Sequence, residues 1–191
     1  HFETTRFRGE FPIASIDFVD STFPGTVRMT AFNPLIPGND RDSSIPAAFF
    51  EFEIENTTDS TLTYTLSGAL KNPHSVGTGV NEYRYTSAGH QVVLNGDGID
   101  HDSVDFGDMT IATDAAEVSY QEYWFRGSWF DNLAVFWHDF TASGRFENRR
   151  YGSSGDRDGV AYGKEDQATL ATHAEIAPGE TVTNRFVVSW N

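Results

Sequence analysis

The chain has 191 residues, a formal net charge of −15 and no cysteine. Its length predicts one domain over residues 1–191. Its acidic balance argues against nucleic acids as partners, because binding to phosphate backbones requires clustered Lys and Arg. The lack of cysteine excludes disulfides, thiolate-bound zinc and a cysteine nucleophile. No run of 18 apolar residues is present, so no segment is expected to span a membrane.

The N-terminus and the basic residues bear on the source of the protein. Residues 1–11 lack the pattern of a signal peptide, and the compartment stays open between cytoplasmic and secreted. The chain contains 11 Arg but only two Lys, Lys71 and Lys164. An acidic surface poor in Lys is typical of proteins that stay soluble in high salt. A halophilic source is therefore one hypothesis, and an ordinary acidic extracellular domain is the alternative.

Short alternating segments predict an all-β domain, mainly an antiparallel β-sandwich. Phe outnumbers Leu by 16 to 7, a composition that favours strands over helices. In chain order, strands are expected at residues 13–18, 26–32, 50–55, 62–66, 91–94, 109–112, 116–123, 169–176 and 181–190.

The two-residue period is clearest in the middle and at the end of the chain. In residues 50–55, Phe and Ile alternate with three Glu, so a slip of one residue in register would turn the carboxylates into the core. Polar turns at 56–60 and 177–180 separate neighbouring strands. The last strand is expected to bury one face, which consists of Val182, Phe186, Val188 and Trp190.

One segment has helical rather than strand periodicity. Its apolar positions follow spacings of 4, 3, 1 and 3, which predicts one short amphipathic helix near residues 129–142; they are Trp129, Leu133, Phe136, Trp137 and Phe140. Ser128 is suited to its N-cap, and Gly144 can adopt the left-handed conformation that ends a helix. The helix is expected to lie on the sandwich.

Four segments are expected to be irregular, at residues 33–46, 71–89, 95–108 and 149–167. They are rich in Gly, Pro, Asp, Asn and Ser. Long ordered loops in a compact domain are often functional, so these segments are the first places to look for a site.

The segment 95–108 holds the densest group of acidic residues. Asp97, Asp100 and Asp102 are candidate metal ligands, because calcium prefers carboxylate oxygens. The spacing does not match the helix–loop–helix calcium motif, and a solvated acidic turn is the alternative. Calcium is possible, and no other cofactor is expected.

Familiar catalytic motifs are absent. The six His do not have the spacing of a metal site, and no nucleophile elbow, phosphate-binding loop or dinucleotide fingerprint occurs. Paired carboxylates could hydrolyse a glycosidic bond, but 28 acidic residues are too many for the sequence to single out a pair. Tyr83, Tyr85, Tyr123 and Trp124 could stack on sugar rings, or they could belong to the core.

Several motifs in order resemble the N-terminal domain of glycoside hydrolase family 116, the family of the non-lysosomal glucosylceramidase and microbial β-glucosidases. The resemblance begins with the strand at 8–18 and continues through the segments 31–37 and 42–50. It extends to the pattern around the expected helix and to the final strand at 186–190. It is carried most specifically by AFNPLIP followed by DSSIPAAFFEFEIEN.

The resemblance implies a β-sandwich that packs against an (α/α)₆ barrel of the same polypeptide. In that family the barrel holds the catalytic Glu and Asp of a retaining β-glycosidase, and neither catalytic motif has a match here. This chain alone is therefore expected to be non-catalytic. It would be either a fragment of a longer glycosidase that lacks its catalytic domain or a stand-alone relative.

The expected role is to brace the barrel, with the loops 33–44 and 83–90 shaping access for a carbohydrate or glycolipid substrate. The candidate contact residues are Asn39, Asp40, Asp42, Tyr83, Tyr85 and Trp124. The alternative is a stand-alone carbohydrate-binding or adhesive module, which needs an exposed aromatic platform. An interdomain brace would instead show a large apolar patch. A calcium-stabilised module is a third possibility.

Overall fold

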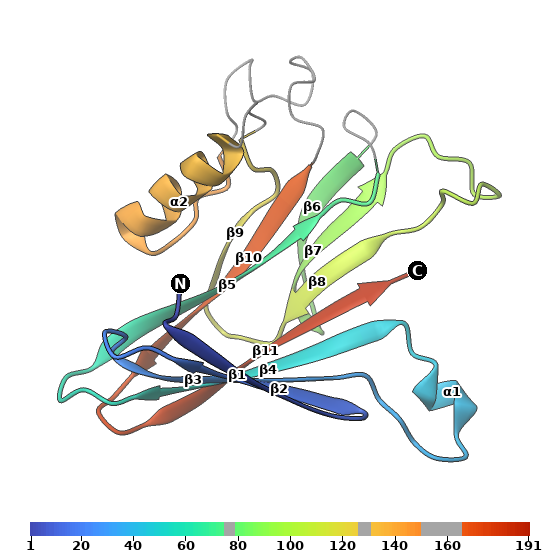
Figure 1. The fold of residues 1–191 in the computed structure, drawn as a ribbon. Coiled ribbons are helices and arrows are strands. Elements are labelled where there is room, and N and C mark those ends of the chain that lie inside the picture. Colours follow the sequence, from blue (N-terminus) through green and yellow to red (C-terminus); the bar gives the residue numbers. More distant parts are fainter. Residues whose placement is uncertain (75–78, 126–130, 150–165) are drawn as a thin grey trace.

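The computed structural model describes residues 1–74, 79–125, 131–149 and 166–191. Within them, antiparallel strands form two sheets, of eight and three strands. Figure 1 shows strands β1–β4 in the lower part and helix α2 at the upper left, with the small sheet between them. The predicted fold class, an all-β and mainly antiparallel β-sandwich with one short amphipathic helix, is confirmed.

The large sheet has the strand order β1-β2-β3-β4-β11-β8-β7-β6, and the small sheet has the order β5-β10-β9. The strands of the large sheet are β1 (Thr4–Glu10), β2 (Ile13–Val19), β3 (Gly25–Phe32), β4 (Ala47–Asn56), β6 (Gly79–Thr86), β7 (Gly89–Gly96), β8 (Met109–Thr113) and β11 (Thr181–Trp190). Those of the small sheet are β5 (Leu62–Lys71), β9 (Val118–Gln121) and β10 (Gln167–Ile176).

The short polar turns carry the chain from one sheet to the other. The strands β4 and β5 flank the turn at 56–60, and β10 and β11 flank the turn at 177–180, yet neither pair is hydrogen-bonded. Instead, β4 pairs with β3 and β11, while β5 pairs with β10. Each turn therefore joins the two layers, and the buried faces of its flanking strands meet across the core.

Two apolar clusters fill the space between the sheets. The first joins Leu94, Ile111 and Phe186 of the large sheet to Leu170 of the small sheet. The second consists of Val27, Ile54, Tyr64 and Ile176, with Phe2, Phe18 and Phe23 packed against it. These residues occupy alternate positions in their strands, so the predicted alternation places them on the inner faces.

The helix α2 (Asp131–Ser143) packs on the outer side of the small sheet. Phe136 stacks on Trp124 at 4.2 Å between ring centroids, and Phe140 stacks on Phe146 at 5.2 Å. Gly144 ends the helix with a φ of 68°, as predicted. The expected N-cap Ser128 and the first expected helical residues lie outside the described residues.

Two strands were not expected from the sequence. β1 is exposed along its whole length and lacks an apolar alternation. β6 falls in the segment 71–89, which was predicted to be irregular, and pairs with β7 in a hairpin. Its inner face includes the buried polar residue Asn81, which hides the alternation.

Two further predictions need correction. Trp190 was expected to be buried, but it is 46% exposed, because it lies at the end of β11 beyond the small sheet. The segment 33–46 contains a short helix, α1 (Asp40–Ser43), although it was predicted to be irregular. Among the described residues, no helix is long and apolar enough to cross a membrane.

Candidate functional site

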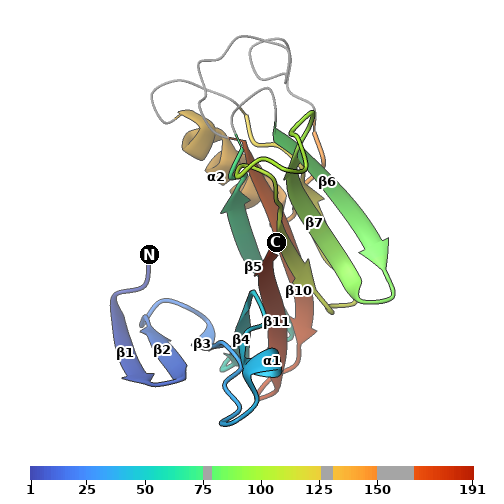
Figure 2. The ribbon, with the colours of Figure 1, turned by 90° about the vertical axis from the view of Figure 1, so that its right-hand side faces the viewer.

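Exposed apolar side chains gather at the end of the large sheet where β11 terminates. We call this the C-terminal end surface. It faces the viewer in Figure 2, with α1 below the C-terminus and the segment 97–108 above it. Its exposed apolar residues are Phe11, Ile13, Leu35, Ile36, Ile45, Val104, Phe106 and Trp190.

Backbone pairing joins the elements that carry this surface. The Trp190 amide donates to the Pro46 carbonyl at 3.0 Å, which joins β11 to the end of the segment 33–46. The Asn191 and Asp108 backbones exchange two hydrogen bonds, at 3.1 and 3.2 Å. Ile13 lies opposite the last residue of β3. The surface therefore has a rigid base of paired backbone.

An open hollow of about 590 Å³ lies in the upper part of the C-terminal end surface. Trp190, Phe106 and Asp108 line it together with His74. The His74 Nε2 atom lies 2.9 Å from the Gly107 carbonyl oxygen, so this ring holds the wall in place. The hollow thus combines two exposed aromatic rings with polar groups.

The segment 33–46 places three predicted contact residues on the lower part of the same surface. The Asn39 side chain caps α1: its oxygen accepts from the Asp42 amide at 3.1 Å, and its amide donates to the Asp42 carboxylate at 2.6 Å. Asp40 is exposed in the first turn. Asn39 and Asp42 therefore shape the segment, and Asp40 faces solvent.

The three candidate calcium ligands lie in the segment above the hollow. The Asp100 carboxylate accepts from the Asp102 amide at 3.0 Å, in a tight turn, and the Asp102 side chain is fully exposed. Within the described residues, no three carboxylate or imidazole side chains gather closely enough to hold a metal ion. Calcium binding at Asp97, Asp100 and Asp102 stays a hypothesis without preformed geometry.

The predicted aromatic contacts are spread over other parts of the fold. Tyr83 stacks on Tyr120 at 3.8 Å, and its hydroxyl lies 2.6 Å from His90 Nδ1. Burial raises the pKa of Tyr83, and the neighbouring phenolates of Tyr120 and Tyr85 would raise it further. Tyr85 is 72% exposed, at the far end of β6.

Trp124 is only 9% exposed, and its indole N–H donates to Thr169 Oγ1 at 2.6 Å. It packs under α2, so it offers little surface to a sugar. Trp137 is 52% exposed on α2, on the opposite side of the molecule from Trp190. The fourth Trp lies outside the described residues. The structure therefore does not unite Trp124, Trp137 and Trp190 in one platform.

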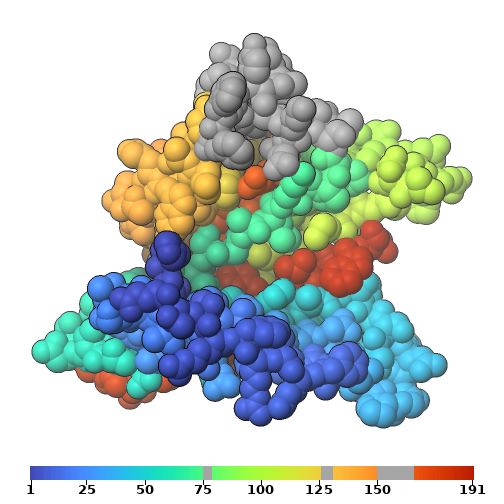
Figure 3. Space-filling view, viewed as in Figure 1, coloured from blue at the N-terminus to red at the C-terminus, as the bar shows by residue number. Residues whose placement is uncertain are grey.

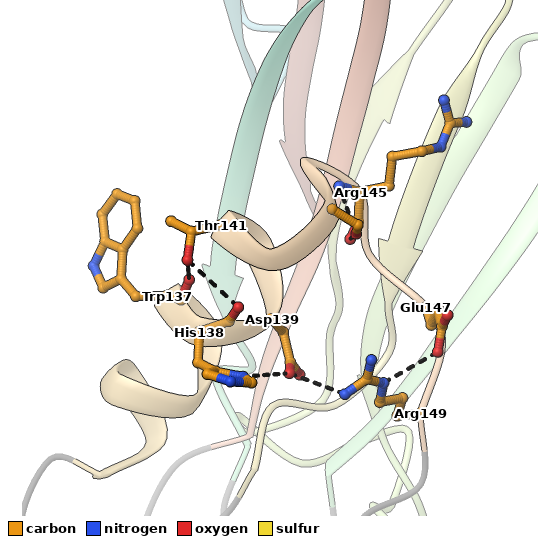
Figure 4. Close-up of polar contacts among 8 residues, drawn as sticks. Trp137, His138, Asp139, Thr141, Arg145, Glu147 and Arg149 are labelled. Atoms are coloured by element: carbon orange, nitrogen blue, oxygen red, sulfur yellow. Dashed lines mark hydrogen bonds and ion pairs between the residues drawn. The ribbon is translucent and has the colours of Figure 1, made fainter.

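Figure 4 shows the polar contacts beside Trp137. The buried Asp139 carboxylate accepts from Arg149 at 3.0 Å and lies 3.5 Å from His138 Nδ1. Arg149 also contacts Glu147 at 3.2 Å. These groups bind one another and tie α2 to the chain that follows it, which is a structural role.

A buried polar cluster lies at the upper end of the small sheet, and the sequence did not single it out. The Asn72 side-chain amide donates to Asn81 Oδ1 at 2.7 Å and to the Asn95 carbonyl at 3.1 Å. The Asn81 side chain donates to the Glu122 carbonyl at 2.6 Å. The cluster joins β5, β6, β7 and the segment after β9. The one signal for this cluster in the sequence is Asn81, a polar residue at a buried position of a strand.

A second polar chain runs through His173, which is 6% exposed. Thr65 Oγ1 donates to the Gly144 carbonyl at 2.9 Å, so the ring must donate from Nδ1 to Thr65. Nε2 then accepts from Ser119, whose oxygen accepts from the Phe146 amide. Burial lowers the pKa of His173, and the charge of Arg145 lowers it further. This buried chain anchors the end of α2 and is not accessible to a substrate.

The whole sequence, residues 1–191, matches the family described as beta-glucosidase 2, glycosyl-hydrolase family 116 N-term. A comparison with curated protein sequences finds no match.

Two solved structures are distantly similar to this chain. One is described as a kojibiose phosphorylase from the human microbiome, at 9% identity and a TM-score of 0.46; the match covers 94% of this chain and 18% of that one. Another is a polysaccharide lyase, at 10% identity and a TM-score of 0.47, with coverage of 93% and 21%. The chain thus spans about a fifth of either protein, and likenesses at this level carry no functional argument.

Proposed function

Since this chain belongs to the N-terminal domain family of glycosyl-hydrolase family 116, we propose that it braces the catalytic domain of a β-glucosidase-like enzyme. The brace itself is non-catalytic, and the reacting carboxylates lie in the catalytic domain of the same polypeptide. The 191-residue chain alone should therefore not hydrolyse an aryl β-glucoside.

The C-terminal end surface is the observation that carries this proposal. Exposed apolar side chains are scattered singly on most soluble domains, whereas a contiguous group marks an interaction site. Here Phe106 lines the same hollow as Trp190, the last residue of β11, and the others lie in the segment 33–46 and at the β1–β2 turn at the same end of the large sheet. A domain docked on this surface would bury Trp190, Phe106 and Leu35 together.

The segment 33–46 gives the same surface a second role. It carries α1 beyond the end of the large sheet, at the lower right of Figure 1. Asn39 and Asp42 hold its shape, and Asp40 points into solvent beside the docked domain. We propose that this segment borders the entrance to the substrate site. A carbohydrate-binding module is less well supported, because the three described Trp do not form one platform.

The test compares two exposed Trp residues in the full-length enzyme. Trp190→Asp should weaken the contact with the catalytic domain, so that limited proteolysis releases the N-terminal domain at least tenfold faster and kcat/KM for an aryl β-glucoside falls. Trp137→Asp is the matched control, because Trp137 is similarly exposed but lies on α2. Equal effects of the two substitutions would refute the proposed contact.

A further inference from the structure

We propose that the protein binds an extended, basic peptide segment at the free edge of β11, in a pocket beyond the end of β8. The pocket is lined by the first half of β11, whereas the C-terminal end surface lies at the last residue of that strand. Figures 1 and 3 show the turn at 177–180, which leads into β11, at the lower left, at the opposite end of the strand from the C-terminus. The inference therefore does not depend on the proposed contact with the catalytic domain.

The first observation is that β11 loses one neighbour halfway along its length. β8 pairs only with residues 187–190 of β11, and the chain then crosses to β9 in the small sheet. On this edge, Thr113 Oγ1 donates to the Arg185 carbonyl at 2.6 Å. Backbone groups two residues apart in a strand point to the same edge, so the Thr183 amide and carbonyl point there too. No described residue bonds to them at this edge.

The second observation is an open pocket of about 420 Å³ beside this edge. Its lining comes from β11, from β10 and from the segment 114–117 that crosses between the sheets. Several of the lining side chains are small, and these are Ala115, Ala116 and Ala174. The chain itself therefore does not fill the space next to Thr183, and a second backbone can enter it.

The third observation is a buried carboxamide without a partner. Asn184 is 6% exposed, lines the pocket and forms no hydrogen bond with its side chain among the described residues. It lies on the inner face of β11 between Val182 and Phe186, which pack in different core clusters. In the opposite layer, the buried Oγ1 atom of Thr172 also lacks a partner. An unpaired buried polar group destabilises a fold, so Asn184 calls for a partner that the pocket admits.

The polar groups of the pocket match an extended peptide. Backbone groups at a free strand edge bind a further strand, and pockets for alternate side chains give such binding its specificity. The peptide residue opposite Asn184 would direct its side chain to the same inner face, where a hydroxyl or an amide would bond to the carboxamide. A sugar fits less well, because no Phe, Tyr or Trp of the described residues lines the pocket.

The charges around the pocket favour basic side chains at the alternate positions of the peptide. Asp114 and Glu117 line the pocket, and Glu53 lies on the outer face of the neighbouring strand β4. Arg185 also lines the pocket, but it already pairs with Glu51 at 2.9 Å. The whole chain has a net charge of −15. Charge complementarity therefore favours Lys or Arg over acidic residues in the peptide.

Titration of the full-length protein with a peptide tests the site. The probe is the acetylated and amidated pentapeptide Lys-Thr-Lys-Thr-Lys, whose central Lys would pair with Thr183 and place a Thr opposite Asn184. We expect a dissociation constant below about 1 mM at low salt. An analogue with a methylated backbone nitrogen at the central Lys should bind about tenfold more weakly or worse, because it cannot donate to the Thr183 carbonyl. Absence of binding, or equal binding of the two peptides, would overturn the proposal.

A substitution at Asn184 separates binding from a structural role. Asn184→Leu should weaken peptide binding about tenfold or more, yet raise the thermal midpoint of the peptide-free protein by about 2 °C, because it removes an unpaired polar group. Asn81→Leu is the matched control, since Asn81 is equally buried but bonds to Asn72 and to the Glu122 carbonyl. It should lower the midpoint. A lower midpoint for Asn184→Leu would indicate a structural role and overturn the proposal.

Charge reversal tests the preference for a basic peptide. Asp114→Lys should weaken binding of the pentapeptide about fivefold or more. Asp102→Lys is the control, because Asp102 is fully exposed in the segment 97–108, and it should change binding by about twofold or less. Equal effects would indicate non-specific attraction to an acidic protein and would refute the site.

Other occupants give distinct results, and each would overturn the proposal. Displacement of the pentapeptide by cellobiose would point to a carbohydrate. A higher thermal midpoint for Asn184→Leu without any peptide binding would point to ordered water only.

Discussion

The two halves of the large sheet both have an apolar inner face, but only one half is covered by the small sheet. β4, β11, β8 and β7 lie under the small sheet, and there Phe186 and Leu94 are almost fully buried. β1 and β2 extend beyond the small sheet, and there Phe7 remains exposed. Alternation thus specifies which face of a strand is apolar, whereas burial depends on a second layer that the strand itself does not contain.

The largest expected effect on stability compares a core residue of the covered half with an exposed residue of the other half. Phe186→Ala should lower the free energy of unfolding of the 191-residue chain by about 3–5 kcal/mol, because it leaves a cavity in the first core cluster. Phe7→Ala should cost about 0.5 kcal/mol or less in the same chain, because its ring is already in water. Chemical denaturation measures both values. Similar costs would mean that the overhanging face is buried in solution.

An intermediate effect is expected at the upper end of the covered half. Asn72→Ala should cost about 2–3 kcal/mol, because Asn81 Oδ1, the Asn95 carbonyl and the His74 amide would lose their partner in a buried site. Asn33→Ala, at an exposed position where the side chain donates to the Ala47 carbonyl, is the control and should cost about 1 kcal/mol. Equal losses in denaturation experiments would argue against a cooperative polar cluster.

The smallest expected effect is a pH dependence on the outer side of the small sheet. The pKa of His173 is lowered in the folded state by burial, while the unfolded chain protonates near the ordinary value of about 6.5. Between these two pKa values the unfolded state binds more protons than the folded state, so the free energy of unfolding decreases as the pH falls. The His173 contribution should therefore be complete above about pH 6.5 and decline below it.

Thermal unfolding from pH 7.5 to 5 checks this expectation. His173→Gln should flatten the profile in that range, because Gln does not titrate. His138→Gln is the control, since His138 is exposed on α2. If the His173 variant kept the slope of the parent chain, another group would have to account for it.

Much of the strand pattern followed from local periodicity. The segments around residues 13–18, 26–32, 50–55 and 181–190 all form strands where the alternation of apolar and polar residues predicted them. β1 was not predicted because both of its faces are exposed. β6 was not predicted because the polar residue Asn81 occupies a buried position in it. In both cases the usual link between apolar side chains and burial is absent.

The candidate surface was harder to predict than the strands. Asn39, Asp40 and Asp42 lie on the C-terminal end surface, and Asp97, Asp100 and Asp102 lie in the segment above it, but Tyr83 and Trp124 belong to other parts of the fold. Trp190 and Phe106, which line the hollow, come from segments more than 80 residues apart. The pairing of β11 with β8, which the Asn191 and Asp108 backbones continue, brings them together.

The sequence by itself determined the fold class, the family and the apolar face of most strands, because these depend on local alternation and on motifs read in order. The tertiary structure decided which strands pair, which faces are covered and where exposed apolar residues gather. The physical reason is that pairing and coverage join residues distant in the chain: the turns after β4 and β10 look like hairpin turns, yet each passes between layers.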